Sequence, residues 1–117
     1  MAETVSLAVL ENLVHMSRED FPAGYVLISA VLPDGIHVSD EDDVIKEFGR
    51  LEKNRLGDLW IDRCSSAVLA VRSTVVPFER NFLLNPQHPG FAAITVEPAM
   101  PFSFDDRLFG RREFRRV

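Results

Sequence analysis

The side chains of this sequence that are able to do chemistry are mainly carboxylates, hydroxyls and amides. The three histidines stand far apart with no H-x-x-x-H pair, and a single cysteine cannot build a zinc site, so we expect no metal centre. The glycines are scattered and form no phosphate-binding loop. The polar candidates that remain are Glu11, Ser66, Ser73, Glu79, Asn81 and Asn85.

Each of these candidates also has an ordinary structural explanation. Glu11 would be an exposed helix residue that pairs with His15 one turn later, and Ser73 would simply end a strand. The stretch "NFLLNPQHPGF" (81–91) would be a turn-rich connection, with its asparagines and prolines shaping the backbone and its apolar residues plugging the core. A nucleophilic pair such as Cys64 with His88 has no spacing signature to support it.

The first elements that would position these residues are a helix, a strand and a second helix. The run "TVSLAVLENLVHM" (4–16) places apolar residues at the helical period and predicts a core-packed helix. The β-branched run 25–33 predicts a strand, and the extended piece 36–38 follows a turn. Ser39 is expected to cap a helix that begins at about Asp40 and ends at Gly49.

The second half of the chain reads as one short helix followed by strands. Residues 55–63 show helical spacing, and the extended run 66–76 is stopped by Pro77. Residues 91–97 are the next strand candidate, and "PFSF" (101–104) suggests a brief edge strand. Because helices and strands do not alternate regularly, the order predicts an α+β fold.

Composition and charge indicate one acidic domain with a basic tail. Of the net charge of −5, residues 1–106 contribute 8 basic and 17 acidic side chains, and residues 107–117 contribute five arginines and one glutamate. An acidic body argues against nucleic acid as a direct ligand. No apolar run suits a membrane span and the N-terminus lacks a secretory signal, so a cytoplasmic protein is expected. We expect Cys64 to be buried or half-buried.

Several segments together resemble the RES domain, the toxin domain of bacterial RES–Xre toxin–antitoxin pairs. The first half contributes "SLAVLENLVHM" (6–16) and "LGDLW" (56–60). The second half contributes a strand that ends in Ser73, "VVP" (75–77), Glu79, the 81–91 block and "PFSFDDRLF" (101–109). The resemblance covers almost the whole chain, with residues 1–110 as a partial RES-like domain and 111–117 as the basic tail.

The resemblance implies a fold and an activity. The fold would be like that of ADP-ribosyltransferases, a small mixed sheet with flanking helices. The activity would be the degradation of NAD at the nicotinamide–ribose bond, by hydrolysis or with phosphate as the acceptor, so NAD would be a substrate and no cofactor is expected. Glu11 and Ser73 match the family's glutamate and serine, with Ser66 as a weaker candidate for the serine. The neutralising partner would be an Xre-like antitoxin.

The chemistry of these side chains agrees with that activity. Departure of nicotinamide leaves cationic character on the ribose, which the Glu11 carboxylate would stabilise. Ser73, and with it Asn81 or Asn85, would hold the nicotinamide carboxamide or the ribose hydroxyls. Leu83 and Leu84 would anchor the segment that carries the asparagines.

The family's N-terminal strand block, which carries its arginine, has no counterpart in these residues. Without that block, sheet edge and apolar surface are exposed, which favours self-association into a homo-oligomer. The alternative is therefore a catalytically inactive RES remnant that only binds an antitoxin or itself.

Overall fold

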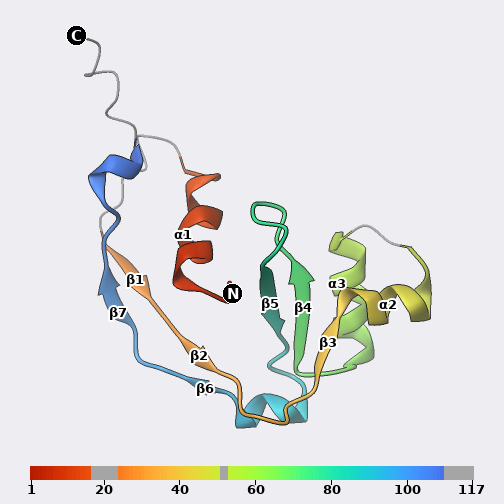
Figure 1. Cartoon of the computed structure of the whole chain (residues 1–117). Coiled ribbons are helices and arrows are strands. Elements are labelled where there is room, and N and C mark those ends of the chain that lie inside the picture. Colours follow the sequence, from red (N-terminus) through yellow and green to blue (C-terminus); the bar gives the residue numbers. More distant parts are fainter. Residues whose placement is uncertain (17–23, 51–52, 110–117) are drawn as a thin grey trace.

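The computed structural model describes residues 1–16, 24–50 and 53–109, and they form a three-stranded sheet with helices and a curved arm of paired strands (Figure 1). The strand order in the sheet is β3-β4-β5, with β3 parallel to β4 and β4 antiparallel to β5. The elements on this side of the molecule are β3 (Val38–Asp40), α2 (Glu41–Phe48), α3 (Lys53–Arg63), β4 (Val68–Arg72) and β5 (Arg80–Leu84).

The main core lies between this sheet and the two helices α2 and α3. Trp60 and Leu56 of α3 pack with Val44 of α2 and Leu69 of β4, and all four side chains are buried. A second cluster on the sheet consists of the buried Ala67, Val68 and Ile94, with Phe82 and other partly buried apolar residues against it. Because α3 supplies the largest buried side chain, Trp60, the predicted helix 55–63 is confirmed together with its apolar face.

The arm consists of two short antiparallel ribbons that follow one another along the same two chain segments (Figure 1). β1 (Tyr25–Leu27) pairs with β7 (Met100–Phe102), and β2 (Ala30–Val31) pairs with β6 (Thr95–Val96). The single strand predicted for 25–33 is therefore divided in two. The strand predicted for 91–97 is mostly wrong, because Pro89–Ala93 form a 3₁₀ turn, whereas the edge strand predicted at 101–104 is present as β7.

Helix α1 (Val5–Leu13) lies between the arm and β5 (Figure 1). Its predicted burial is wrong: Leu7 is buried, but Val5 and Leu10 are 49% and 41% exposed. Ahead of the helix, Ala2 forms an antiparallel bridge with Asn81, so the first residues run along the edge of β5. Helix α1 therefore lies beside the edge strand β5, and most of its apolar side chains are not buried against the sheet.

Helix α2 begins one residue later than the sequence pattern predicts. Asp40, not Ser39, is the N-cap: its carboxylate accepts from the Asp43 N–H, and the Asp43 carboxylate accepts from the Asp40 N–H. Ser39 is instead a buried residue of β3 whose hydroxyl lies 2.8 Å from that of Ser66. Gly49 ends the helix with φ of +87°, as predicted.

The described residues form three small sheets and several helices, which confirms the α+β class. Cys64 is exposed, so its predicted burial is wrong. Within the part of the chain that the structure describes, no helix has the length and apolar character to cross a membrane. A 3₁₀ turn, Asp106–Phe109, is the last described element, and the basic tail 111–117 lies outside the described residues.

Candidate functional site

The half-buried Glu11 in the last turn of α1 reaches the end of the β4–β5 ladder. The helix starts at Thr4, whose hydroxyl accepts a hydrogen bond from the Leu7 N–H at 3.0 Å. The same hydroxyl donates to Glu79 Oε1 at 3.1 Å. This contact fixes the start of the helix to the loop between β4 and β5, and Glu11 is placed two turns further on.

Ser73 follows β4 directly and is 2% exposed. Its hydroxyl donates to Glu11 Oε2 at 2.7 Å and accepts from the backbone N–H groups of Val75 and Val76, both at 3.0 Å. A serine hydroxyl has one donor and two acceptor positions, so all three are occupied. Capture of the two N–H groups turns the chain, which is why β4 ends at Arg72 although the extended pattern runs to 76.

Asn81 reaches the same carboxylate oxygen from the neighbouring strand. Its Nδ2 donates to Glu11 Oε2 at 2.7 Å, and its backbone pairs with Val71 in the β4–β5 ladder. The structure therefore brings three of the predicted site residues together, from positions 11, 73 and 81. We call Glu11, Ser73 and Asn81 the glutamate cluster.

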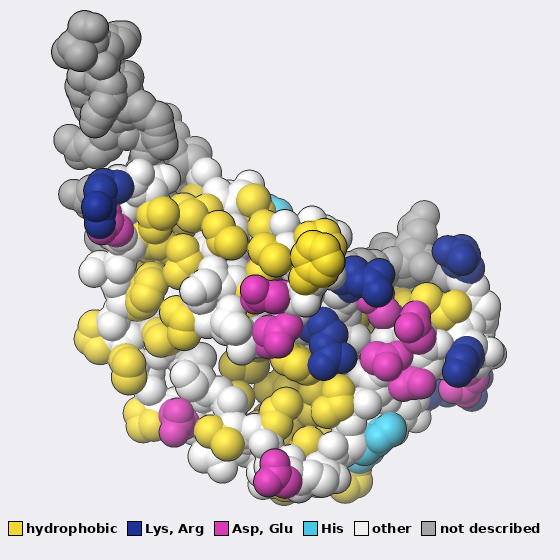
Figure 2. Space-filling view, in the orientation of Figure 1, with side chains coloured by type: hydrophobic (Ala, Val, Ile, Leu, Met, Phe, Trp, Pro, Cys, Tyr) yellow, Lys and Arg dark blue, Asp and Glu magenta, His cyan; other side chains and the backbone are white. Residues whose placement is uncertain are grey.

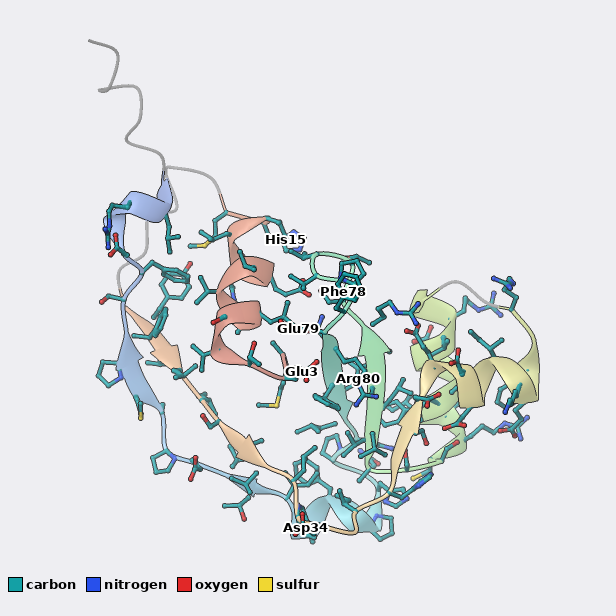
Figure 3. The ribbon with its side chains drawn as sticks, viewed as in Figure 1. Glu3, His15, Asp34, Phe78, Glu79 and Arg80 are labelled. Atoms are coloured by element: carbon teal, nitrogen blue, oxygen red, sulfur yellow. The ribbon has the colours of Figure 1, made fainter. Side chains whose placement is uncertain are left out.

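The surroundings of the cluster are polar and charged. Arg80 donates its backbone N–H to Glu3, and Figure 3 shows these two residues and Glu79 close to one another beside the start of the chain. Burial lowers the pKa of the Met1 amino group, and the Glu11 carboxylate acts on that pKa in the opposite direction.

The other two predicted site residues lie elsewhere. Ser66 is buried and accepts from the Trp60 indole N–H at 2.9 Å, while its hydroxyl donates to the Val68 carbonyl at 2.8 Å. Asn85 is buried at the opposite end of the β4–β5 ladder, where Nδ2 lies 3.8 Å from Cys64 Sγ. Ser66 thus joins the segment before β4 to α3, and the Asn85 side chain lies against Cys64, the residue that follows α3.

The block from 81 to 91 divides into two parts with different roles. Asn81 to Leu84 belong to β5, whereas from Asn85 onward the chain turns, with Asn85 Oδ1 accepting from the Gln87 N–H and His88 Nδ1 from the Gly90 N–H. The turn interpretation thus holds for the second part. Leu83 is 41% exposed, so it does not anchor the segment in the core as predicted.

Sequence reasoning did not single out Thr4, although it connects the helix to Glu79. The signal was available, because a threonine just before an apolar helical run is typical of an N-cap. Glu79 was a polar candidate, and the structure shows its carboxylate accepting from the Thr4 hydroxyl. Among residues 1–16, 24–50 and 53–109, no three metal-ligating side chains gather in one place.

An apolar hollow of about 380 Å³ lies between α1, the arm and β5, and its lining contains none of the three cluster residues. Its lining includes Val5 and Ala8 of α1, Leu27 and Ala30 of the arm, and Phe82 of β5. Figure 2 shows hydrophobic side chains across this recess, with acidic and basic side chains next to it. Ala8 lies one helical turn before Glu11, so the hollow approaches the cluster along the helix.

Comparison with known proteins identifies the family of this chain. The RES domain matches residues 1–105. The chain is a member of the RES domain family. The fold of that family is ADP-ribosyltransferase-like, which agrees with the observed α+β class.

Three RES relatives are similar over most of the chain. A protein named Toxin Res from Photorhabdus laumondii is 32% identical over 114 residues, which cover 92% of this chain and 73% of the relative. A Toxin Res from Pseudomonas putida is 35% identical over 108 residues, 87% of this chain and 72% of the relative. The Prs ADP-ribosylating toxin from Sphingobium is 28% identical over 116 residues, 92% of this chain and 71% of the relative.

Proposed function

We propose that this RES domain protein is the toxin of a bacterial toxin–antitoxin pair, and that it degrades NAD by breaking the nicotinamide–ribose bond. The observation that supports this most is the glutamate cluster, in which two donors hold one carboxylate oxygen at 2.7 Å each. The relatives named as toxins, one of them as ADP-ribosylating, support the same class of activity.

The proposed reaction breaks the bond between ribose C1′ and the nicotinamide ring nitrogen. Both bonding electrons leave with nicotinamide, which becomes neutral, and positive charge develops on the ribose. The Glu11 carboxylate stabilises that charge. Water then adds to C1′ and releases a proton, giving ADP-ribose, or inorganic phosphate adds instead and gives the 1″-phosphate of ADP-ribose.

In this proposal Glu11 is the catalytic residue, and Ser73 and Asn81 are positioning residues. The Ser73 hydroxyl has no remaining hydrogen-bonding capacity for a substrate, because it already donates once and accepts twice. Asn81 holds the same oxygen from β5. Together the two residues restrict the carboxylate to one orientation, and accurate orientation of reacting groups removes a large entropic part of a barrier.

Release of free nicotinamide from NAD tests the proposal directly. We expect Glu11→Gln to lower the rate by about 100- to 1,000-fold, the usual effect of losing one electrostatic stabiliser of a transition state. The matched control is Glu47→Gln, because Glu47 is an exposed glutamate on α2, away from the cluster. No nicotinamide release by the unaltered protein, or equal release by the Glu11→Gln variant, would refute the proposal.

The partner that we propose is an Xre-like antitoxin. Expression of the protein in bacteria should arrest growth, and co-expression of the antitoxin should restore it. Cellular NAD should fall in the first culture and recover in the second. Growth arrest without a fall in NAD would separate toxicity from NAD cleavage and refute the proposed reaction.

A second candidate function is a non-catalytic module that binds an antitoxin or a second copy of itself. The observation in its favour is the apolar hollow beside α1, together with exposed apolar side chains on the arm such as Val26 and Val96, at 56% and 54%. If the chain binds antitoxin while Glu11→Gln leaves growth inhibition unchanged, this candidate replaces the enzyme. Sedimentation of the isolated protein measures the self-association.

A further inference from the structure

Phe78 stands out among the exposed apolar residues of the described chain. Its side chain is 99% exposed, whereas the other large apolar side chains on the surface range from 41% to 58%. Isolated apolar residues that are partly exposed are normal in small proteins. A phenylalanine that contacts almost nothing gains no stability from the fold, so its place on the surface calls for another explanation.

The loop that carries Phe78 is tightly held. Its two ends are joined by a hydrogen bond of 2.9 Å from the Ser73 N–H to the Glu79 carbonyl, and the Glu79 N–H donates to the Val76 carbonyl at 2.9 Å. Inside the loop the Ser73 hydroxyl accepts from both Val75 and Val76. Figure 3 shows Phe78 at the outer end of this loop. The exposed ring is therefore carried by a loop whose backbone is held by several hydrogen bonds.

The same hydrogen bonds connect the backbone of this loop to the glutamate cluster. Ser73 Oγ, which organises the loop, also donates to Glu11. Phe78 directly precedes Glu79, the residue opposite Ser73, so the Cα atoms of Phe78 and Ser73 lie within about 9 Å by strand geometry. The loop that presents this exposed ring thus begins at Ser73, the residue that donates to the proposed catalytic carboxylate.

We propose that Phe78 is a stacking platform for a heterocyclic base of the dinucleotide that binds at the glutamate cluster. This inference rests on the proposed function, because NAD supplies two such rings, adenine and nicotinamide. An aromatic ring in water favours an offset stack with a base. Because hydrogen bonds already hold the backbone of the loop, that backbone loses little conformational entropy on binding. Phe78 then sets affinity for the substrate, while Glu11 acts on the bond that breaks.

The test compares Phe78→Ala and Phe78→Trp with the unaltered protein. We expect Phe78→Ala to raise KM for NAD by about 5- to 150-fold, equal to about 1–3 kcal/mol, with kcat changed less than threefold. Phe78→Trp should restore the low KM, since indole also stacks. The melting temperature should stay unchanged in both variants. The matched control is Met100→Ala, which removes another large apolar side chain, 55% exposed on β7.

Nicotinamide mononucleotide, which lacks the adenine ring, identifies the base. A rise in KM for NAD alone assigns the stack to adenine, and an equal rise with both substrates assigns it to nicotinamide. An unchanged KM for both in Phe78→Ala, or the same rise in Met100→Ala, overturns the inference. Calorimetric titration with NAD distinguishes this failure from failure of the proposed reaction, because Phe78-dependent binding without nicotinamide release refutes only the cleavage.

Discussion

The three-stranded sheet and the two-stranded ribbons of the arm bury their apolar side chains to very different extents. In β4, Val68 and Leu69 are fully buried, whereas Val31 of β2 and Val96 of β6 are 50% and 54% exposed. The difference follows from layering: β4 has a strand on each side and helices α2 and α3 over one face, while β2 has only β6 beside it. Two-stranded ribbons are at best marginally stable alone, so the arm depends on what covers it.

Truncating a buried side chain in the core between the three-stranded sheet and helices α2 and α3 should lower stability more than the other substitutions considered below. Trp60→Ala removes the largest buried side chain and leaves the Ser66 hydroxyl without its indole donor. We expect the free energy of unfolding to fall by about 3–5 kcal/mol. Urea denaturation followed by far-ultraviolet circular dichroism measures the change, since Trp60 is the only tryptophan. A loss below about 1 kcal/mol would mean that the core between the three-stranded sheet and helices α2 and α3 contributes little to stability.

An intermediate effect is expected where α1 meets the sheet. Ser73→Ala deletes the hydroxyl that joins Glu11 to the Val75 and Val76 N–H groups, at a cost of about 1 kcal/mol in stability. Nicotinamide release should fall about 10- to 100-fold, because the carboxylate is less well oriented. Ser73→Thr keeps a hydroxyl and should recover most of the rate. Equal losses in both variants would point to general disruption instead of positioning.

The smallest effect is expected on the arm. Val96→Ala shortens a side chain that is already half in water, so the free energy of unfolding should change by no more than about 0.5 kcal/mol. The same urea series measures it beside Trp60→Ala. A loss above about 1 kcal/mol in the isolated protein would show that the arm is covered in solution, and a dependence of that loss on protein concentration would identify a second copy as the cover.

The sequence predicted elements well where local signals agree with one another. Helix α2 combines acidic residues at its start with Gly49 at its end, and α3 has helical spacing around Trp60. Errors arose where a distant partner decides the outcome. Ser39 has the right chemistry for a cap, but Ser66, 27 residues away, engages its hydroxyl in the core. The β2–β6 pairing likewise depends on chain segments that no local pattern relates.

The resemblance to the RES domain named candidate site residues. Composition and spacing alone could not show which of them lie close together. The meeting of Glu11 with Ser73 and Asn81 depends on how α1 lies against β5, which a one-dimensional pattern does not contain. Ser66 and Ser73 look alike in sequence, as serines at the two ends of one extended run. Both are buried, and their partners distinguish them: Ser66 accepts from the Trp60 indole N–H, whereas Ser73 donates to Glu11.

The members of the glutamate cluster are far apart in the order in which a ribosome makes them. Glu11 and Asn81 are separated by 70 residues and Glu11 and Ser73 by 62. At translation rates of about 5–20 residues per second, roughly 4–14 seconds pass between the first and the last of these residues. A nascent chain, or a product of translation that stops before Ser73, therefore carries the glutamate without its two hydrogen-bond donors. A cell that makes this protein would meet the assembled site only after Asn81 has been synthesised.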